Sequence, residues 1–121
     1  MPSRDPKITA AYQAYKQTAG PECPFCELGD REIIAKYSHF VILRALFPYE
    51  EWDSKHVNEH LMAVPKRHVK NFSEMNQQEA MELLQIISQY EIDGYSMYAR
   101  APKDVMRSIT HQHTHLLLLE R

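Results

Sequence analysis

The sequence has no apolar run of membrane-spanning length, no excess of either charge and only two cysteines. A transmembrane helix needs about 20 consecutive apolar residues, so no membrane span is predicted. Residues 1–5 also lack the apolar segment of a secretory signal, and we therefore expect a cytoplasmic location. The 14 basic and 16 acidic residues nearly balance. This balance argues against a broad surface for nucleic acid or for anionic membranes.

The composition, 44% hydrophobic and 25% charged, is that of an ordinary globular protein. A chain of 121 residues forms a modest core, which a metal ion or a partner subunit would help to stabilise. We therefore expect one domain over residues 1–121, with an N-terminal helix in residues 1–20 and the core in residues 21–121.

Three histidines near the C-terminus, His111, His113 and His115, alternate with single residues. Successive side chains of a β-strand point to opposite faces, so this spacing predicts three imidazoles in one row on one side of a sheet. Imidazole can act as nucleophile, general acid or metal ligand near neutral pH. The row therefore indicates chemistry, although an incidental cluster on a polar strand would have the same spacing.

The remaining pattern predicts short strands and two helices. A first helix is predicted over about residues 6–18, and a second is predicted to begin after Ser73 and to end before Asp93. The inward face of the second helix is predicted to carry Ala80, Leu83, Leu84 and Ile87. Strands are predicted at residues 32–37, 40–46, 61–64, 95–101 and 111–119, an exposed loop at 48–58 and a connecting loop at 102–107. The pattern favours an α+β fold with about five antiparallel strands and two main helices.

Two further segments precede the histidine row in a definite order. Cys23-Pro24-Phe25-Cys26 comes first, and an apolar segment after His60 ends in Pro65-Lys66-Arg67-His68. Together the three segments resemble the histidine-triad family of nucleotide hydrolases and transferases, in its zinc-binding Cys-x-x-Cys branch. The resemblance covers about residues 22–121. It implies the α+β fold of that family and a homodimer, which would also cover an exposed sheet edge.

The two cysteines, Cys23 and Cys26, indicate a metal site or a redox pair before a structural disulfide. Thiolates at this spacing can both reach one Zn²⁺, which normally takes two further nitrogen or sulfur ligands. The resemblance implies that His68 and His111 complete a structural zinc site. The alternatives are free thiols in a loop and a thioredoxin-like redox pair, although the βαβ context of such a pair is missing.

The resemblance also implies roles for the remaining site residues. His113, the middle histidine, would attack the α-phosphate of a nucleotide conjugate and form a covalent nucleotidyl-histidine. His115 would stabilise the negative charge that builds on the phosphate oxygens. Ser108 matches a family serine near the leaving group, and His60 matches a family histidine near the active site. Both residues would also be unremarkable in a strand that has no function.

Several positions depart from the family pattern. Gln112 and Thr114 stand between the histidines, where apolar residues are usual. Arg100 replaces a frequent asparagine, and its guanidinium could hold phosphate instead. Ala45 stands where an acidic or amide side chain usually binds the ribose hydroxyls. The residues that could replace it in ribose binding are Glu50, Glu51 and Asp53.

These observations favour an enzyme that cleaves purine nucleotide conjugates at the α-phosphate, as a phosphoramidase or a nucleotidyl hydrolase. His115 favours hydrolysis, because family members that transfer nucleotides tend to carry glutamine at this position. One alternative is a catalytically weak, nucleotide-binding regulatory module. Another is a hydrolase whose catalytic Zn²⁺ is bound by all three histidines of the row. The expected partners are a purine nucleotide and a second copy of the chain, without nucleic acid or membrane.

Overall fold

The computed structural model describes residues 6–7, 23–104, 106–107 and 109–121. The predicted first helix, over about residues 6–18, lies almost wholly outside these residues, and so does Ser108. Among the described residues, no helix is both long enough and apolar enough to cross a bilayer.

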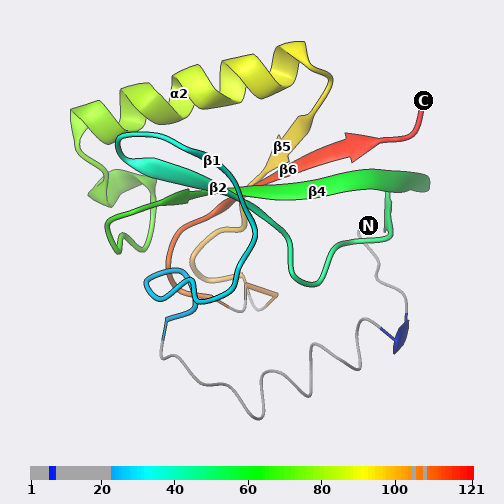
Figure 1. The fold of residues 1–121 in the computed structure, drawn as a ribbon, viewed down its shortest axis with the longest axis horizontal. Coiled ribbons are helices and arrows are strands. Elements are labelled where there is room, and N and C mark those ends of the chain that lie inside the picture. The colour runs from blue at the N-terminus through cyan, green and yellow to red at the C-terminus, as the bar shows by residue number, and fades with distance from the viewer. Residues whose placement is uncertain (1–5, 8–22, 105, 108) are drawn as a thin grey trace.

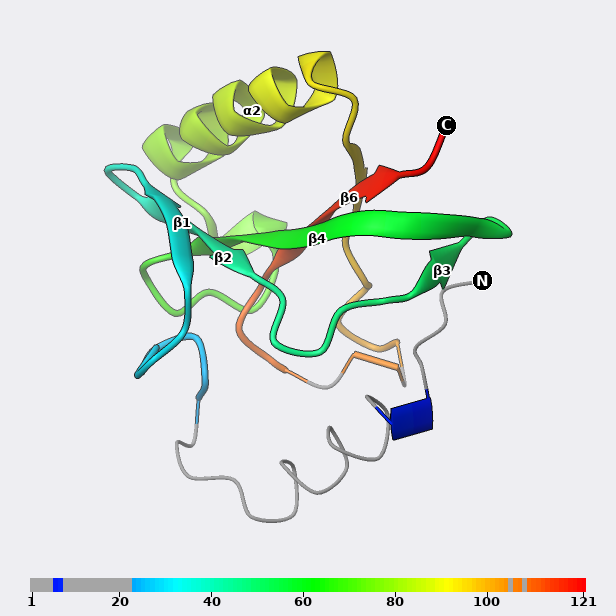
Figure 2. The same cartoon turned by 45° about the vertical axis from the view of Figure 1, so that its right-hand side comes forward.

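Six strands form an antiparallel sheet in the order β1-β2-β4-β6-β5, and β3 pairs with β4 off this path (Figures 1 and 2). The described part of the chain has one main helix, α2 (Gln77–Ile92), preceded by the 3-10 turn η1 (Phe72–Glu74). The α+β prediction is confirmed, with six strands rather than five. The strands are β1 (Ile33–Lys36), β2 (Phe40–Arg44), β3 (Glu51–Trp52), β4 (Lys55–Pro65), β5 (Ser96–Tyr98) and β6 (Thr114–Leu119).

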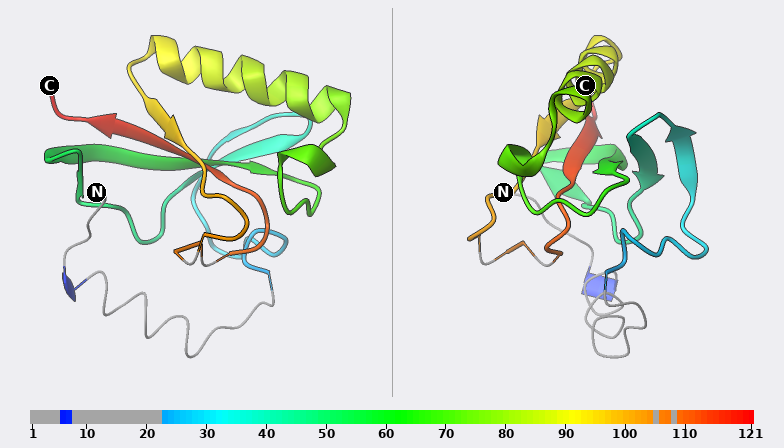
Figure 3. Two further views of the ribbon diagram at one scale, coloured as in Figure 1. Left: turned by 180° about the vertical axis from the view of Figure 1, so that it is seen from behind. Right: turned by 90° about the vertical axis from the view of Figure 1, so that its left-hand side faces the viewer.

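Helix α2 lies along one face of the sheet, and the segments that carry the cysteines and lead into β6 lie on the other side (Figures 1 and 3). Strands β2 and β4 serve both faces because their successive side chains alternate. The cluster beneath α2 contains Phe40, Ile42, Leu61, Ala63, Leu83, Ile86 and Leu116. The cluster on the opposite face contains Phe25, Val41, Leu43, Met62 and Val64. Phe25 thus anchors the Cys-x-x-Cys turn on the side away from the helix.

Helix α2 begins three residues later than the sequence predicted. Its N-cap is Asn76, whose Oδ1 accepts from the Glu79 N–H at 2.8 Å while the Glu79 carboxylate accepts from the Asn76 N–H at 2.9 Å. This reciprocal capping box satisfies two helix-end donors, so the cap at Ser73 was wrong. The predicted end of the helix, before Asp93, is confirmed.

The predicted inward face of α2 is also partly wrong. Leu83 and Ile86 are buried, but Ala80 and Leu84 are exposed, Leu84 by 66%. The first inward position belongs to Glu79, which is 2% exposed and ion-paired with Arg67. A pattern of apolar residues cannot show a charged side chain that is buried because its partner comes from another segment.

The predicted exposed loop at residues 48–58 is wrong, because β3 and the start of β4 form a β-hairpin there. The two turn residues, Asp53 and Ser54, have φ angles of 53° and 61°. A two-residue turn of this kind needs positive φ at both positions. Glycine, which usually marks such turns, is absent from this one, so no residue pattern here predicts a hairpin. The strands predicted at residues 32–37 and 40–46 are confirmed as β1 and β2, which pair as an antiparallel hairpin.

Candidate active site and metal centre

The histidine row leads into β6 rather than lying within it. The strand begins at Thr114, so only His115 is a strand residue. Before the strand, the Gln112 N–H donates to the Val69 carbonyl at 2.7 Å and not to a neighbouring strand. The predicted strand row is therefore wrong for the first two histidines. The rings still gather on one face, because the His113 and His115 centroids are 5.1 Å apart and Phe25 packs against His113 at 5.0 Å.

The side chains between the histidines are buried despite being polar. Gln112 and Thr114 are each 3% exposed. Within the described residues, Gln112 Oε1 and Thr114 Oγ1 have no hydrogen-bond partner. These two side chains are therefore packed against the rest of the protein. Removing their polar atoms from water without a hydrogen-bond partner costs free energy.

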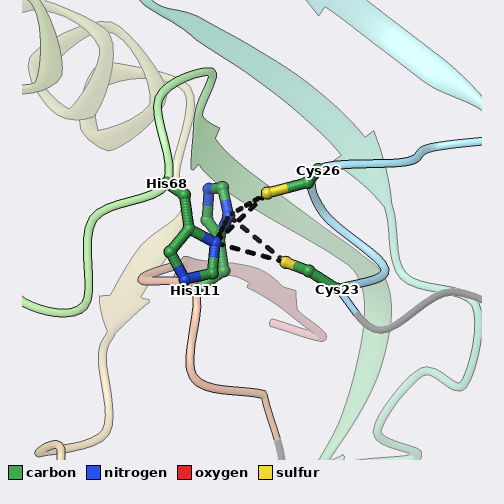
Figure 4. Close-up of side chains that lie close together, drawn as sticks. All are labelled: Cys23, Cys26, His68 and His111. Carbon is green, nitrogen blue, oxygen red and sulfur yellow. Dashed lines mark hydrogen bonds between the residues drawn. The ribbon is translucent and has the colours of Figure 1, made fainter.

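Cys23, Cys26, His68 and His111 converge on one point from three segments of the chain (Figure 4). Their Sγ and Nδ1 atoms all lie within 4.8 Å of one another. The two Nδ1 atoms are 3.1 Å apart, and the sulfur–nitrogen distances lie between 3.1 and 3.5 Å. Tetrahedral zinc with ordinary bond lengths separates two nitrogens by about 3.3 Å and sulfur from nitrogen by about 3.5 Å. The cluster could therefore hold a metal ion, and its donors fit zinc.

Local hydrogen bonds explain why these ligands meet. The Cys23 carbonyl accepts from the N–H groups of Cys26 and Glu27, both at 3.2 Å, which forms the turn that brings the thiols together. His111 is fully buried, and its Nε2–H donates to the Pro65 carbonyl at 2.7 Å. That bond leaves Nδ1 as the unprotonated nitrogen facing the cysteines, which is the form that a metal binds.

His68 is held by its neighbour in the chain, Arg67. The Arg67 guanidinium donates to both oxygens of the Glu79 carboxylate, at 2.7 and 3.2 Å, and to the Glu74 carbonyl at 2.7 Å. This bidentate bond ties the segment after β4 to the first turn of α2. Arg67 holds the pKa of Glu79 below its ordinary value, so the carboxylate is ionised at neutral pH.

His113 has the tautomer of a nucleophile. Its Nδ1–H donates to the His111 carbonyl at 2.9 Å, so Nε2 carries the free electron pair. Burial lowers the pKa of His113 to about 4, which keeps the ring neutral at pH 7. A neutral imidazole with an unprotonated nitrogen can attack an electrophilic phosphorus atom.

His115 and His60 form a buried pair across strands β6 and β4. The Tyr49 N–H donates to His60 Nδ1 at 3.1 Å, which assigns the His60 proton to Nε2. His60 Nε2 lies 2.8 Å from His115 Nδ1 and therefore donates to it. The proton of a neutral His115 is then on its own Nε2. The hydrogen bonds from Tyr49 to His60 and from His60 to His115 thus leave His115 Nε2–H as a donor on the side away from His60.

Tyr49 and Arg100 complete this side of the site. The Tyr49 ring lies nearly parallel to His60, with centroids 4.6 Å apart, and is tilted against His115 at 5.5 Å. Arg100 donates from one Nη to the Tyr49 hydroxyl at 3.2 Å and from the other to Asp104 Oδ2 at 3.3 Å. Arg100 was predicted as a site residue, but Tyr49 was missed. An aromatic residue in a short connection has no periodic pattern that would predict its burial.

The other predicted residues are placed less centrally. The Ala45 methyl packs beside the cluster around Phe25 and offers no hydrogen bond. The candidates for ribose binding, Glu50, Glu51 and Asp53, are exposed at the β3–β4 hairpin.

No protein-family model and no curated protein matches the sequence. Solved histidine-triad structures nevertheless share its fold. The match to a HIT family hydrolase from Clostridium thermocellum spans 82% of this chain and 91% of that chain, with 20% identity and a TM-score of 0.61. A histidine triad protein from Clostridium difficile matches over 84% and 93%, with 16% identity and a TM-score of 0.63. A hypothetical histidine triad nucleotide-binding protein from Sulfolobus tokodaii matches over 79% and 68%, with 18% identity and a TM-score of 0.64.

The described chain therefore has the histidine-triad fold, and the resemblance seen in its motifs is confirmed at the level of that fold. A shared fold does not by itself assign an activity, so the function has to be argued from the site.

Proposed function

We propose that this protein is a nucleotide-binding hydrolase that cleaves purine nucleotide conjugates at the α-phosphate. The observation that carries the proposal is the tautomer of His113, whose Nδ1–H is bound to the His111 carbonyl at 2.9 Å. His115 lies beside it as the charge-stabilising donor, with ring centroids 5.1 Å apart. These two roles support the proposal of phosphoramidase or nucleotidyl hydrolase chemistry at a phosphorus–nitrogen or phosphoanhydride bond.

The reaction has two steps. His113 Nε2 donates its electron pair to phosphorus, and the bond from phosphorus to the leaving group breaks, with its electron pair going to that group. Water then attacks the nucleotidyl-histidine, breaking the phosphorus–nitrogen bond to release the nucleoside monophosphate and regenerate the neutral imidazole; the proton that this water loses balances the one that the leaving group took up from solvent in the first step. His115 Nε2–H and the Arg100 guanidinium would bind the phosphate oxygens as negative charge builds on them. Ser108 is proposed to contact the leaving group.

We also propose that the metal cluster holds a structural zinc ion and takes no direct part in these steps. Zinc would fix the Cys-x-x-Cys turn and His68 against the segment that carries His111, two residues before the nucleophile. In the described chain only His111 of the three triad histidines belongs to the cluster, and His113 donates its Nδ1–H to a carbonyl. This arrangement supports structural zinc over a catalytic zinc bound by the whole triad.

A second candidate is a nucleotide-binding module with little turnover. It is favoured by Ala45, whose methyl group cannot bind a ribose hydroxyl. A turnover assay with an adenosine phosphoramidate separates it from the first, because only the hydrolase releases adenosine monophosphate.

The test is replacement of the proposed nucleophile. His113→Ala should abolish turnover of an adenosine phosphoramidate while leaving the metal content and the melting temperature close to wild type. Quenching the wild-type reaction in alkaline denaturant should trap a nucleotidyl adduct on a peptide that contains His113, because the phosphorus–nitrogen bond of this adduct is stable in base but labile in acid. His56→Ala, at an exposed position of β4, serves as the matched control. Substantial activity in the His113 variant would disprove the covalent mechanism.

A further inference from the structure

Tyr49 is buried in the short connection between β2 and β3, and the two-step reaction gives it no role. It is 5% exposed, although the residue that follows it is exposed. Its backbone N–H and its ring both contact His60, and its hydroxyl accepts a hydrogen bond from Arg100. A residue with three such contacts can hold several groups in a common geometry.

The backbone and ring of Tyr49 act on the histidine pair. Its N–H donates to His60 Nδ1 at 3.1 Å, which directs the His60 proton toward His115. Its ring is stacked on His60, at an interplanar angle of 21°. Together these contacts fix the plane and the tautomer of His60, and through His60 those of His115.

The hydroxyl of Tyr49 acts on Arg100. One Nη of Arg100 donates to this hydroxyl at 3.2 Å, and the other donates to Asp104 at 3.3 Å. The guanidinium carbon also lies 5.4 Å from the centre of the Tyr98 ring. The Arg100 side chain is only 12% exposed, so its charge is held close to the protein in one orientation.

The β3–β4 hairpin keeps the Tyr49 ring in place. Trp52, on β3, packs against two tyrosine rings. Its ring centroid lies 5.9 Å from that of Tyr49 and 5.1 Å from that of Tyr98. Tyr49 also packs with Val57 on β4 and Leu117 on β6. The hairpin thus supports the site from the side opposite the metal cluster, although its own charged residues are exposed.

We propose that Tyr49 is a positioning residue that couples Arg100 to the His60–His115 pair, so that both donors address the same phosphate group. This inference rests on the proposed hydrolase function. It also gives the β3–β4 hairpin a role, because Trp52 packs against the Tyr49 ring and keeps it in place. Tyr49 in turn orients Arg100 and His115, the two proposed phosphate contacts. The hydroxyl of Tyr49 should therefore matter for the reaction without contacting the substrate.

The first test is a double-mutant cycle on turnover of an adenosine phosphoramidate. Tyr49→Phe keeps the ring and the backbone N–H but removes the acceptor for Arg100. A hydrogen bond from a charged donor is worth about tenfold in an equilibrium, so kcat/KM should fall about tenfold in a variant that remains fully folded at the assay temperature. In an Arg100→Gln background the same change should have almost no further effect. Tyr90→Phe, on α2 across the sheet, is the matched control and should retain full activity.

The second test needs no substrate. The Arg100 Nε–H resonance should be slow to exchange in the wild-type protein and should broaden or exchange rapidly in Tyr49→Phe, while the imidazole nitrogen shifts of His60 and His115 are unchanged. An unaltered Arg100 resonance in the variant, or full additivity with Arg100→Gln, would overturn the positioning role. A wild-type protein that does not turn over the phosphoramidate would instead refute the proposed function. The substrate-free measurement still decides whether Tyr49 holds Arg100.

Discussion

His60 should contribute to catalysis only through His115, and this expectation can be tested with two variants. In His60→Asn the amide oxygen can still accept from the Tyr49 N–H near the position of Nδ1, but the side chain is too short to donate to His115. In His60→Gln the amide nitrogen can reach His115 Nδ1, but the acceptor for Tyr49 is lost. The wild-type histidine makes both contacts, at 3.1 and 2.8 Å.

The size of the effect follows from what His60→Asn removes. A lost hydrogen bond costs about 0.5–1.5 kcal/mol, which is about 2- to 13-fold in rate when it acts in the transition state. Without the donor, a neutral His115 also divides between its two tautomers. The fraction protonated on Nε2 then falls to about half, which lowers the rate about twofold. The combined decrease in kcat is then about 5- to 25-fold. Removing His115 itself should cost about 10²- to 10³-fold, as for other oxyanion donors.

The assay is steady-state hydrolysis of an adenosine phosphoramidate by the wild type and by His60→Asn, His60→Gln and His115→Ala. His60→Gln should be faster than His60→Asn, because it keeps the donor to His115. Circular dichroism melting would identify any variant whose loss reflects unfolding. If His60→Asn were as slow as His115→Ala, or if it were fully active, the indirect role of His60 would be refuted.

Three other expectations concern metal, assembly and acid stability. Protein purified without added zinc should contain close to one equivalent of Zn²⁺ by elemental analysis; a full complement after Cys23 and Cys26 are both changed to serine would disprove the assigned ligands. Light scattering should report twice the chain mass, because β1 and β5 are edge strands and α2 exposes Leu84 by 66%, whereas a monomer at high micromolar concentration would contradict the dimer. Glu79→Gln should lower the melting temperature at pH 7, because Arg67 lowers the folded-state pKa of the carboxyl. The ionised carboxylate then stabilises the fold above its unfolded pKa of about 4.3, and this advantage over the glutamine variant should disappear as the pH falls through the lower folded-state pKa. A melting difference that does not change with pH would show that the ion pair is not its source.

The sequence was sufficient where the information is local. Cys23 and Cys26 are separated by two residues, and one backbone turn of that length brings their thiols together. The short apolar runs at residues 40–46 and 61–64 predicted strands, and the structure confirms both as β2 and the end of β4. Motif order also predicted that His68 and His111 would join the cysteines, which they do. That prediction used the resemblance to a family and not the spacing alone.

Other features depend on contacts between segments that are distant in the chain. The first inward position of α2 is Glu79, which is buried against Arg67 of a preceding segment, and an apolar pattern does not register a buried charge. The extra hairpin depends on positive φ at Asp53 and Ser54, which many loops without hairpins could also contain.

The sequence by itself determined which chemical groups are available, but the tertiary structure decided the state in which each one is presented. Three histidines at alternate positions supply three imidazoles, yet their roles depend on the protons that they carry. Those protons are placed by acceptors and donors elsewhere: the Pro65 carbonyl for His111, the His111 carbonyl for His113, and His60 for His115. A hydrogen bond has a direction only once both partners are fixed in space, and folding is what fixes them.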